Sequence, residues 1–197
     1  MPLPGALLFP HALLPLYIFE MRYRAMLEYA LAADRMFCVT LINPQRSEWR
    51  SVDDFHHVAG VGLIRACVGR GDGTSNLILQ GLQRVRFVRF AQERPFPIAE
   101  IEPLPSIPAE PPVEAEALAS RVLDFYEKFK GGGRQFPAKI DEYLSDLSDP
   151  EMLADLMGAT FISDALRRQQ LLEELSVARR LRLVIEYLRD ETGHAAA

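Results

Sequence analysis

The pattern of apolar and polar positions divides the chain into a β-rich first half and a helical second half. Several short apolar runs in the first half are separated by glycines, prolines and polar clusters, which is typical of β-strands. They cover residues 36–42, 58–68, 77–90 and 98–102. The Gly/Asp-rich segment 69–76 predicts a hairpin turn, and Gly60, Gly62 and Gly81 predict bends or bulges. This arrangement favours a small closed or half-closed barrel.

One helix is expected within the first half. A strand over residues 16–19 leads into a segment, 22–33, with helical spacing. We expect Tyr23, Met26 and Leu27 to face the core, and Glu20 to lie near the positive end of the helix dipole.

The second half has the apolar spacing of helices. The first helix is expected to end at the glycines 131–133, and a short helix is expected over 140–147. Ser148 to Glu151 has the pattern of a capping box that opens the next helix. The apolar faces of three helices are Leu118, Val122, Phe125 and Phe129; Leu153, Leu156, Met157, Thr160 and Phe161; and Leu181, Val184, Ile185 and Leu188, with arginines opposite the last stripe.

A proline-rich connector, residues 103–112, lies between the two halves and cannot continue a helix or a central strand. The sequence therefore predicts an α+β chain, with a β-rich domain over residues 1–105 and a helical bundle over residues 112–197.

Charge and cysteine content restrict the classes of function that the chain can have. The net charge of −5 argues against a dedicated nucleic-acid-binding protein, which would usually be basic. Cys38 and Cys67 lie in apolar runs, so we expect buried, reduced thiols. No apolar run is long enough to span a membrane and the first residues do not form a signal peptide, so the expected location is the cytoplasm.

Catalytic motifs are absent from the sequence. There is no G-x-x-x-x-G-K-[ST] phosphate loop and no G-x-S-x-G nucleophile motif. His56 and His57 are adjacent, so on an extended chain they would point to opposite faces, and no other motif supports a metal site. Glu100 and Glu102 share one strand face, for which solvation is a simpler explanation than acid–base catalysis. We therefore expect no catalytic residue, cofactor or metal.

The stretch PLPGALLFPHALLPLYIFEMRYRAML resembles the opening of the Lon protease N-terminal domain, in particular that of stand-alone bacterial proteins made of this domain alone. DRMFCVTLINP resembles its second strand, and VAGVGLIRACVGRGDGTSNLILQGLQRVRFVRF resembles its central hairpin, with a QGLQR element. IAEIEPL and LLEELSVARRLRLVIEYL resemble its closing strand and closing helices. The resemblance implies a pseudo β-barrel related to PUA-like folds followed by a helical bundle, with binding of unfolded polypeptides and without the ATPase or serine–lysine protease domains.

The candidate binding residues lie where the chain first turns from strand to helix. Large apolar residues crowd positions 7–19, and about half of them must point away from a barrel interior. These outward residues need a partner, which could be the helical half, a second copy of the chain or a client polypeptide. The expected contacts to a client are Leu14, Leu16, Tyr17, Phe19 and Arg22.

RNA binding is the alternative function. Arg84, Arg86 and Arg89 form a basic strip beside Phe87 and Phe90, which could stack on bases. Solvent-facing arginines on a half-buried strand explain the same pattern.

Overall fold

A single long strand organises the β-rich part of the chain. In the computed structural model, which describes residues 1–46, 48–131, 144 and 147–194, strand β5 (Ser75–Gln92) runs for 18 residues. Strand β4 (Val58–Gly69) pairs with one edge of β5. Along the other edge, β2 (Leu13–Ile18) pairs with the first part of β5 and β6 (Ile98–Pro103) with its second part.

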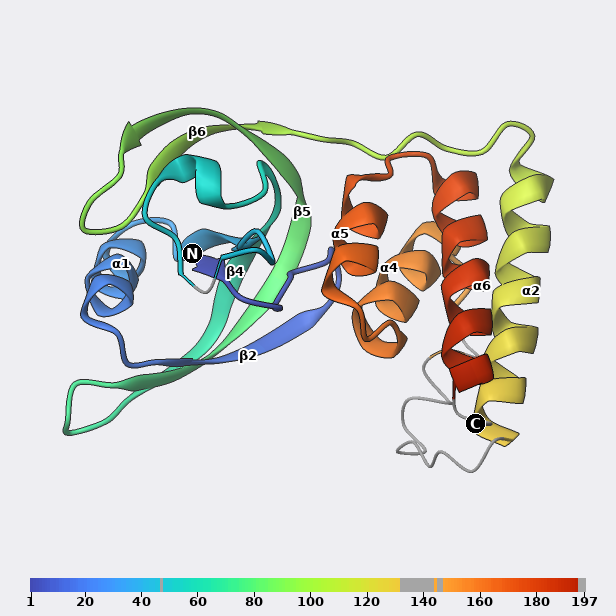
Figure 1. Cartoon of the computed structure of the whole chain (residues 1–197), viewed down its shortest axis with the longest axis horizontal. Helices are drawn as coiled ribbons and strands as arrows, with labels where there is room; N and C mark the ends of the chain where they lie inside the picture. The colour runs from blue at the N-terminus through green and yellow to red at the C-terminus, as the bar shows by residue number, and fades with distance from the viewer. Residues whose placement is uncertain (47, 132–143, 145–146, 195–197) are drawn as a thin grey trace. The chain divides into compact units, whose positions relative to one another are not determined.

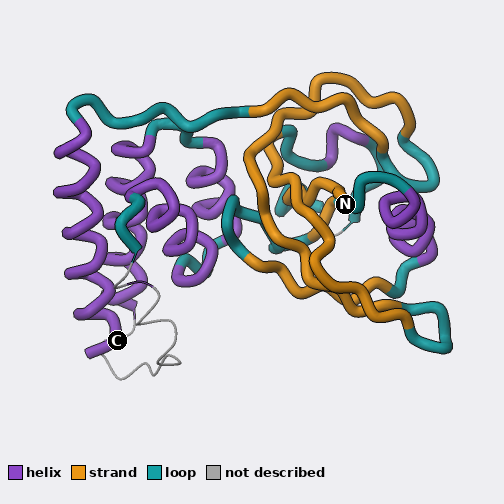
Figure 2. Tube along the Cα trace, turned by 180° about the vertical axis from the view of Figure 1, so that it is seen from behind, coloured by secondary structure: helices purple, strands orange, loops and turns teal. Residues whose placement is uncertain are grey.

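Two further strands complete this sheet. β3 (Met36–Leu41) lies antiparallel to β4, and β1 (Pro2–Leu3) lies parallel to β3. The resulting order is β1-β3-β4-β5-β2, with β6 beside β5, and the strands curl into an incomplete barrel (Figure 2). The predicted α+β class is confirmed by this sheet and the helices that follow it (Figure 1).

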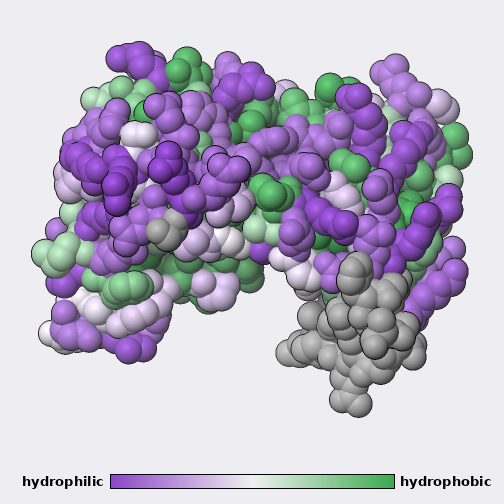
Figure 3. Space-filling view, in the orientation of Figure 1, coloured by the Kyte–Doolittle hydropathy of each residue, from purple (hydrophilic) through white to green (hydrophobic). Residues whose placement is uncertain are grey.

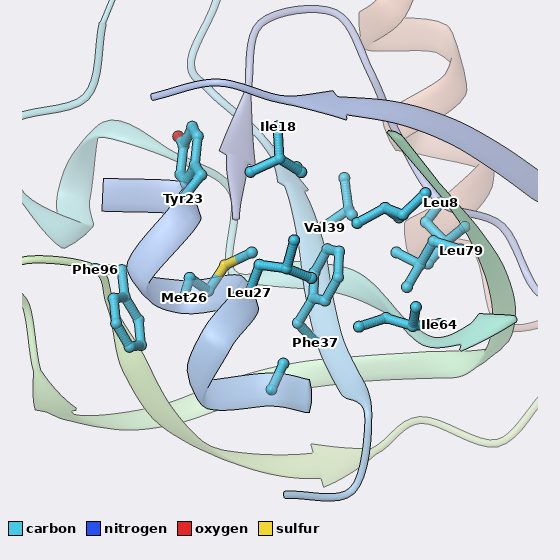
Figure 4. Packing of buried hydrophobic residues seen from close by; sticks show 12 residues of the cluster. Leu8, Ile18, Tyr23, Met26, Leu27, Phe37, Val39, Ile64, Leu79 and Phe96 are labelled. Atoms are coloured by element: carbon cyan, nitrogen blue, oxygen red, sulfur yellow. The ribbon is translucent and has the colours of Figure 1, made fainter. Parts of the chain in front are cut away.

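The chain forms two compact units, Met1–Pro105 and Ser106–Ala197. The core of the first unit lies between helix α1 (Met21–Ala32) and the curved sheet. As expected from the spacing, Tyr23, Met26 and Leu27 are buried on the inner face of α1. Figure 4 shows this face together with Phe37 and Val39 of β3.

The predicted hairpin is present, and one of its two irregularities lies at a pair of glycines. β4 and β5 pair from Gly69 and Ser75 at the turn, with register shifts after Val61 and after Ile64. At the first shift, Gly62 pairs with Gly81 and Leu82 is the extra residue on β5. Such bulges bend a strand and increase its twist, which helps the sheet to curl.

Residues 8–9, near the N-terminus, cross the sheet at glycine positions, where the strands carry no side chains. A Cβ atom at Gly60 would lie 1.9 Å from the carbonyl oxygen of Leu8, and one at Gly81 would lie 1.9 Å from that of Phe9. The crossing is pinned at Gly81, whose backbone N–H donates to Ala12 at 2.9 Å and whose carbonyl accepts from the His11 N–H at 3.0 Å. These glycines are therefore needed for the close approach of two backbones, in addition to any role in bending.

Among the described residues, the second unit contains α2 (Pro112–Gly131), α4 (Pro150–Phe161), α5 (Ala165–Glu173) and α6 (Val177–His194). α6 packs against both α2 and α4, and its predicted apolar stripe is buried. The stripe consists of Leu181, Val184, Ile185 and Leu188. The short helix expected over 140–147 lies largely outside the described residues, as does the end of the triple glycine.

Two details of α4 differ from expectation. Asp149 rather than Ser148 is the N-cap, and its side chain accepts from the Glu151 N–H at 2.9 Å. Pro150 then occupies the first helical turn, where its missing N–H costs nothing. Thr160 was expected on the buried face but is exposed, because buried Gly158 and Phe161 define the actual face.

One arginine of α6 is not on the solvent side, where the sequence predicts it. Arg180 is fully buried, and its guanidinium donates to Asp155, which is also fully buried, at 2.9 Å. It donates further to the Glu174 carbonyl at 2.9 Å and to the Ser106 hydroxyl at 2.8 Å. A buried guanidinium is tolerated because this network supplies its charge partner and hydrogen bonds.

Candidate functional site

The outward face of β2 is apolar and exposed. Alternation along the strand turns Leu14, Leu16 and Ile18 towards the core, and Ile18 is only 1% exposed. Leu13 and Tyr17, on the opposite face, are 62% and 47% exposed. Half of the crowded residues in this segment therefore point outward, as the period of a strand requires.

Neighbouring strands extend this face into a continuous surface. In the pairing register, Pro15 lies opposite Ile78 of β5, and Tyr17 lies opposite Asn76, which pairs with Val68 of β4. Val68 is 66% exposed and Ile78 is 41% exposed. We call this surface the outer strip; it consists of Leu13, Pro15, Tyr17, Phe19, Val68 and Ile78.

The outer strip borders a shallow groove of about 470 Å³. Pro15, Tyr17, Val68 and Ile78 line it, together with Ala66 and other residues of the same three strands. Apolar colour gathers over β2, along the lower edge of the β-rich unit (Figure 3). An exposed apolar surface of this kind is typical of an interaction site.

Two aromatic rings and one cation form the end of the strip nearest the hairpin turn. The rings of Tyr17 and Phe19 stack with centroids 5.7 Å apart, and Phe19 is 58% exposed. The guanidinium of Arg70, from the hairpin turn, lies 5.3 Å from the centroid of the Tyr17 ring. Stacked rings lose little side-chain entropy on binding, and the cation holds one of them in place.

The five residues expected to bind a client do not all lie on this surface. Tyr17 and Phe19 belong to the outer strip, and Leu16 lines the groove while also packing against the core. Leu14 faces the core. Arg22 forms an ion pair with Glu20 at an N···O distance of 2.6 Å, and its guanidinium lies 5.1 Å from the centroid of the buried Trp49 ring. The structure therefore separates Leu14 and Arg22 from the two exposed aromatics.

The sequence did not indicate Val68, Ile78 or Arg70. Their proximity to β2 depends on the antiparallel register that pairs residues 13–18 with residues 75–80. Apolar alternation in both segments was visible, but alternation fixes the faces of a strand without fixing its partner.

The basic strip predicted on β5 is not a continuous exposed surface. Arg84 is only 2% exposed, so it does not face solvent. Arg86 pairs with Glu102 at 2.9 Å, and Arg89 pairs with Glu100. The two glutamates considered for acid–base chemistry therefore neutralise the two exposed arginines across the β5–β6 ladder, as cross-strand pairs of opposite charge do.

The described part of the chain offers little for metal chemistry. Among those residues, no group of three or more His, Cys, Asp or Glu side chains is arranged to hold a metal ion. Burial raises the pKa of Cys38 to about 11, so its thiol stays protonated near neutral pH. No described helix has the length and apolarity needed to cross a membrane.

Comparisons of the sequence with a family model and with curated proteins agree on one family. The family model described as "ATP-dependent protease La (LON) substrate-binding domain" matches residues 1–190. Lon protease 2 of Herpetosiphon aurantiacus is 31% identical over 195 residues, which cover 97% of this chain and 23% of that protein. Lon protease of Dictyoglomus thermophilum is 27% identical over 191 residues, with 97% and 24% covered. The chain thus spans about a quarter of the length of these curated relatives.

Solved structures agree with this fold. The N-terminal domain of Mycobacterium avium complex Lon protease superposes with a TM-score of 0.73 at 20% identity, covering 96% of both chains. A Lon N-terminal domain protein from Xanthomonas campestris gives a TM-score of 0.62 at 19% identity, covering 95% of both chains. The family resemblance predicted from the motifs is confirmed, and the chain belongs to the family of LON substrate-binding domains.

Proposed function

We propose that this chain is a non-catalytic module that binds unfolded or extended polypeptides in the cytoplasm, as an adaptor or a chaperone-like holder. The observation that carries the proposal is the outer strip, an exposed apolar surface on a domain whose family model is described as substrate-binding. Tyr17 and Phe19 are the proposed main contacts, because they are exposed, stacked on each other and held beside the groove.

The remaining predicted residues take supporting roles in this proposal. Leu16 forms the floor of the groove, and Leu14 anchors β2 to the core. Arg22, with its guanidinium held by Glu20, fixes the start of α1 close to Phe19. Self-association through the same apolar surface would compete with a client, and analytical ultracentrifugation over a range of concentrations would detect it.

Fluorescence anisotropy with a labelled, reduced and unfolded model protein tests the proposal. Tyr17→Ala and Phe19→Ala should each weaken binding about tenfold, because burying an exposed aromatic ring contributes roughly 1.5–3 kcal/mol, part of which is offset by ordering the client. Val88→Ala is a matched control, since Val88 is 60% exposed on β5 outside the strip. Unchanged binding by both aromatic variants, with the protein folded, would remove the outer strip as the site.

Salt dependence distinguishes this proposal from RNA binding. Binding by apolar burial should change little between low and high salt, whereas RNA binding should weaken steeply as counterions compete. The ion pairs of Arg86 and Arg89 leave little unpaired positive charge on this part of β5, which favours the polypeptide. Binding of RNA alone, abolished by salt, would favour the alternative.

The proposed absence of catalysis has its own test. The chain has no phosphate loop and matches the substrate-binding domain of the family, so purified protein should hydrolyse neither ATP nor casein. ATP turnover that persists through further purification and follows this protein in every fraction would contradict the proposal.

A further inference from the structure

A second apolar site lies inside the β-rich unit. It is a cavity of about 230 Å³ bounded by α1 and by residues of strands β1, β3, β4, β5 and β6. All of its lining residues belong to the compact unit Met1–Pro105, and none of them lines the groove beside the outer strip. The cavity is therefore a feature separate from the proposed polypeptide site.

The cavity has a buried interior and an exposed rim. Phe37 and Phe96, in its interior, are 8% and 7% exposed. Tyr29, Met36 and Ile101, which also line it, are 57%, 41% and 42% exposed. This gradient indicates that the cavity opens to solvent, so a ligand could enter without unfolding the barrel.

Its walls are rich in aromatic rings that lie tilted or edge to face to one another. Phe55 and Phe87 lie with centroids 6.2 Å apart at an interplanar angle of 88°, and Phe87 and Phe90 are 5.5 Å apart at 57°. Tyr29 and Phe96, from α1 and the β5–β6 connection, form another pair at 5.8 Å. A further ring placed among them would gain tilted or edge-to-face contacts of the same kind, which are worth more than area burial alone.

The lining provides almost no charge for an ionic ligand at neutral pH. Among the described residues, no Asp, Glu, Lys or Arg side chain lines the cavity. The α-amino group of Met1, which also lines it, donates to the Cys38 carbonyl at 2.7 Å, and burial lowers its pKa to about 6, so it is mostly uncharged at neutral pH. The Thr40 hydroxyl already donates to the His56 carbonyl at 2.5 Å. The Cys38 thiol stays neutral because burial raises its pKa. A charged guest would lose its hydration without compensation, so the guest must be neutral.

We propose that this cavity binds one neutral aromatic group of one or two fused rings. An engineered protein cavity of about 150 Å³ with apolar walls binds benzene, so a cavity of about 230 Å³ has room for a larger ring system such as indole. The group could be a free aromatic molecule, or the side chain of a phenylalanine or tryptophan in a polypeptide client. The second source rests on the function proposed above; the first does not.

Methionine methyl groups report on the cavity directly. In protein labelled with ¹³C at the methionine methyls, titration with indole should shift the signals of Met26 and Met36, which line the cavity. The signals of Met152 and Met157, in the helical unit, should not move. The expected Kd is on the order of 1 mM, as for a ligand of so few atoms. Intermolecular NOEs between indole and the Met36 methyl should accompany the shifts in the unaltered protein.

Two matched substitutions localise the binding. Ala99→Leu places three more carbons in the cavity from the edge strand β6 and should weaken indole binding at least tenfold. Ala66→Leu makes the same change in the groove beside the outer strip and should leave indole binding unchanged. No methyl shift and no NOE at several millimolar indole, or equal affinity in both variants, would overturn the proposal.

A pair of peptides identifies the source of the ring. An extended peptide with one tryptophan should shift the Met26 and Met36 signals if a client supplies the group, and its Trp-to-Ala counterpart should not. If indole shifts these signals and neither peptide does, the natural guest is a free molecule. Failure of the polypeptide-binding function would appear separately, as unchanged anisotropy in Tyr17→Ala, and would leave the indole result intact.

Discussion

Replacing Gly60 by alanine should destabilise the β-rich unit far more than an extra methyl group normally does. The new Cβ would lie 1.9 Å from the carbonyl oxygen of Leu8, and the two must separate by about 1.5 Å to reach the 3.4 Å at which ordinary contact begins. The crossing segment cannot yield cheaply, because Leu8 and Phe9 are 0% and 1% exposed. Overpacking of this kind costs about 1–3 kcal/mol, and partial loss of Leu8 packing adds to it. We therefore expect a loss of about 3–4 kcal/mol in the free energy of unfolding.

The assay uses the only tryptophan of the chain. Trp49 is 2% exposed in the β-rich unit, so its fluorescence during urea denaturation reports on that unit. Gly71→Ala is the control, because a Cβ there meets nothing within 4 Å and its backbone is not left-handed. That variant should be unchanged or stabilised by about 0.4–1 kcal/mol. A loss below about 1 kcal/mol in Gly60→Ala would show that the crossing segment is not held as tightly as the structure implies.

Three further predictions concern other parts of the chain. Arg180→Met should lower the free energy of unfolding of the helical unit by about 3–5 kcal/mol, as measured by urea denaturation followed by circular dichroism. Adding Asp155→Leu should restore much of this loss, whereas strictly additive losses would argue against coupling of the pair. Alkylation of Cys38, followed by mass spectrometry, should accelerate about tenfold per pH unit up to about pH 11, because its thiolate fraction at pH 8 is only about 10⁻³; a plateau by pH 9 would contradict the raised pKa. We also propose that the two units fold separately, so limited proteolysis should first cut within residues 103–112 or at the glycines 131–133, whereas early cuts within 77–90 would place the boundary elsewhere.

Most of the fold could be predicted because the apolar spacing was regular. The strands, the hairpin and the stripe on α6 follow from periods of 2 and 3.6 residues, and these periods determine which side chains are buried. The outward direction of Tyr17 could be inferred in the same way, because it lies on the same alternating face of β2 as Leu13 and Pro15. The exposed aromatics were therefore accessible from the sequence, although Leu14 and Arg22 were grouped with them.

The rest depended on contacts between distant segments. The burial of Arg180 follows from Asp155, 25 positions earlier, and no local pattern distinguishes it from the exposed Arg179 and Arg182 of the same helix. Likewise, the sequence predicts only a bend at Gly60, because a backbone crossing from residues 8–9 leaves no local signal. The partners of β2 depend on its register with β5, which the alternation within either strand does not fix.

The shared strand β5 gives the two halves of the barrel separate modes of opening. β2 pairs with residues 75–80 and β6 with residues 85–92, on the same edge of β5. We expect either short strand to detach while the β4–β5 ladder stays intact, so its amide hydrogens should exchange with solvent faster than those at the centre of the ladder. A ligand that peels β2 away from β5 would leave the cavity wall on β6 in place. If the groove beside β2 and the cavity beside β6 both bind as proposed, detachment of one short strand would therefore release first the guest at its own end of β5.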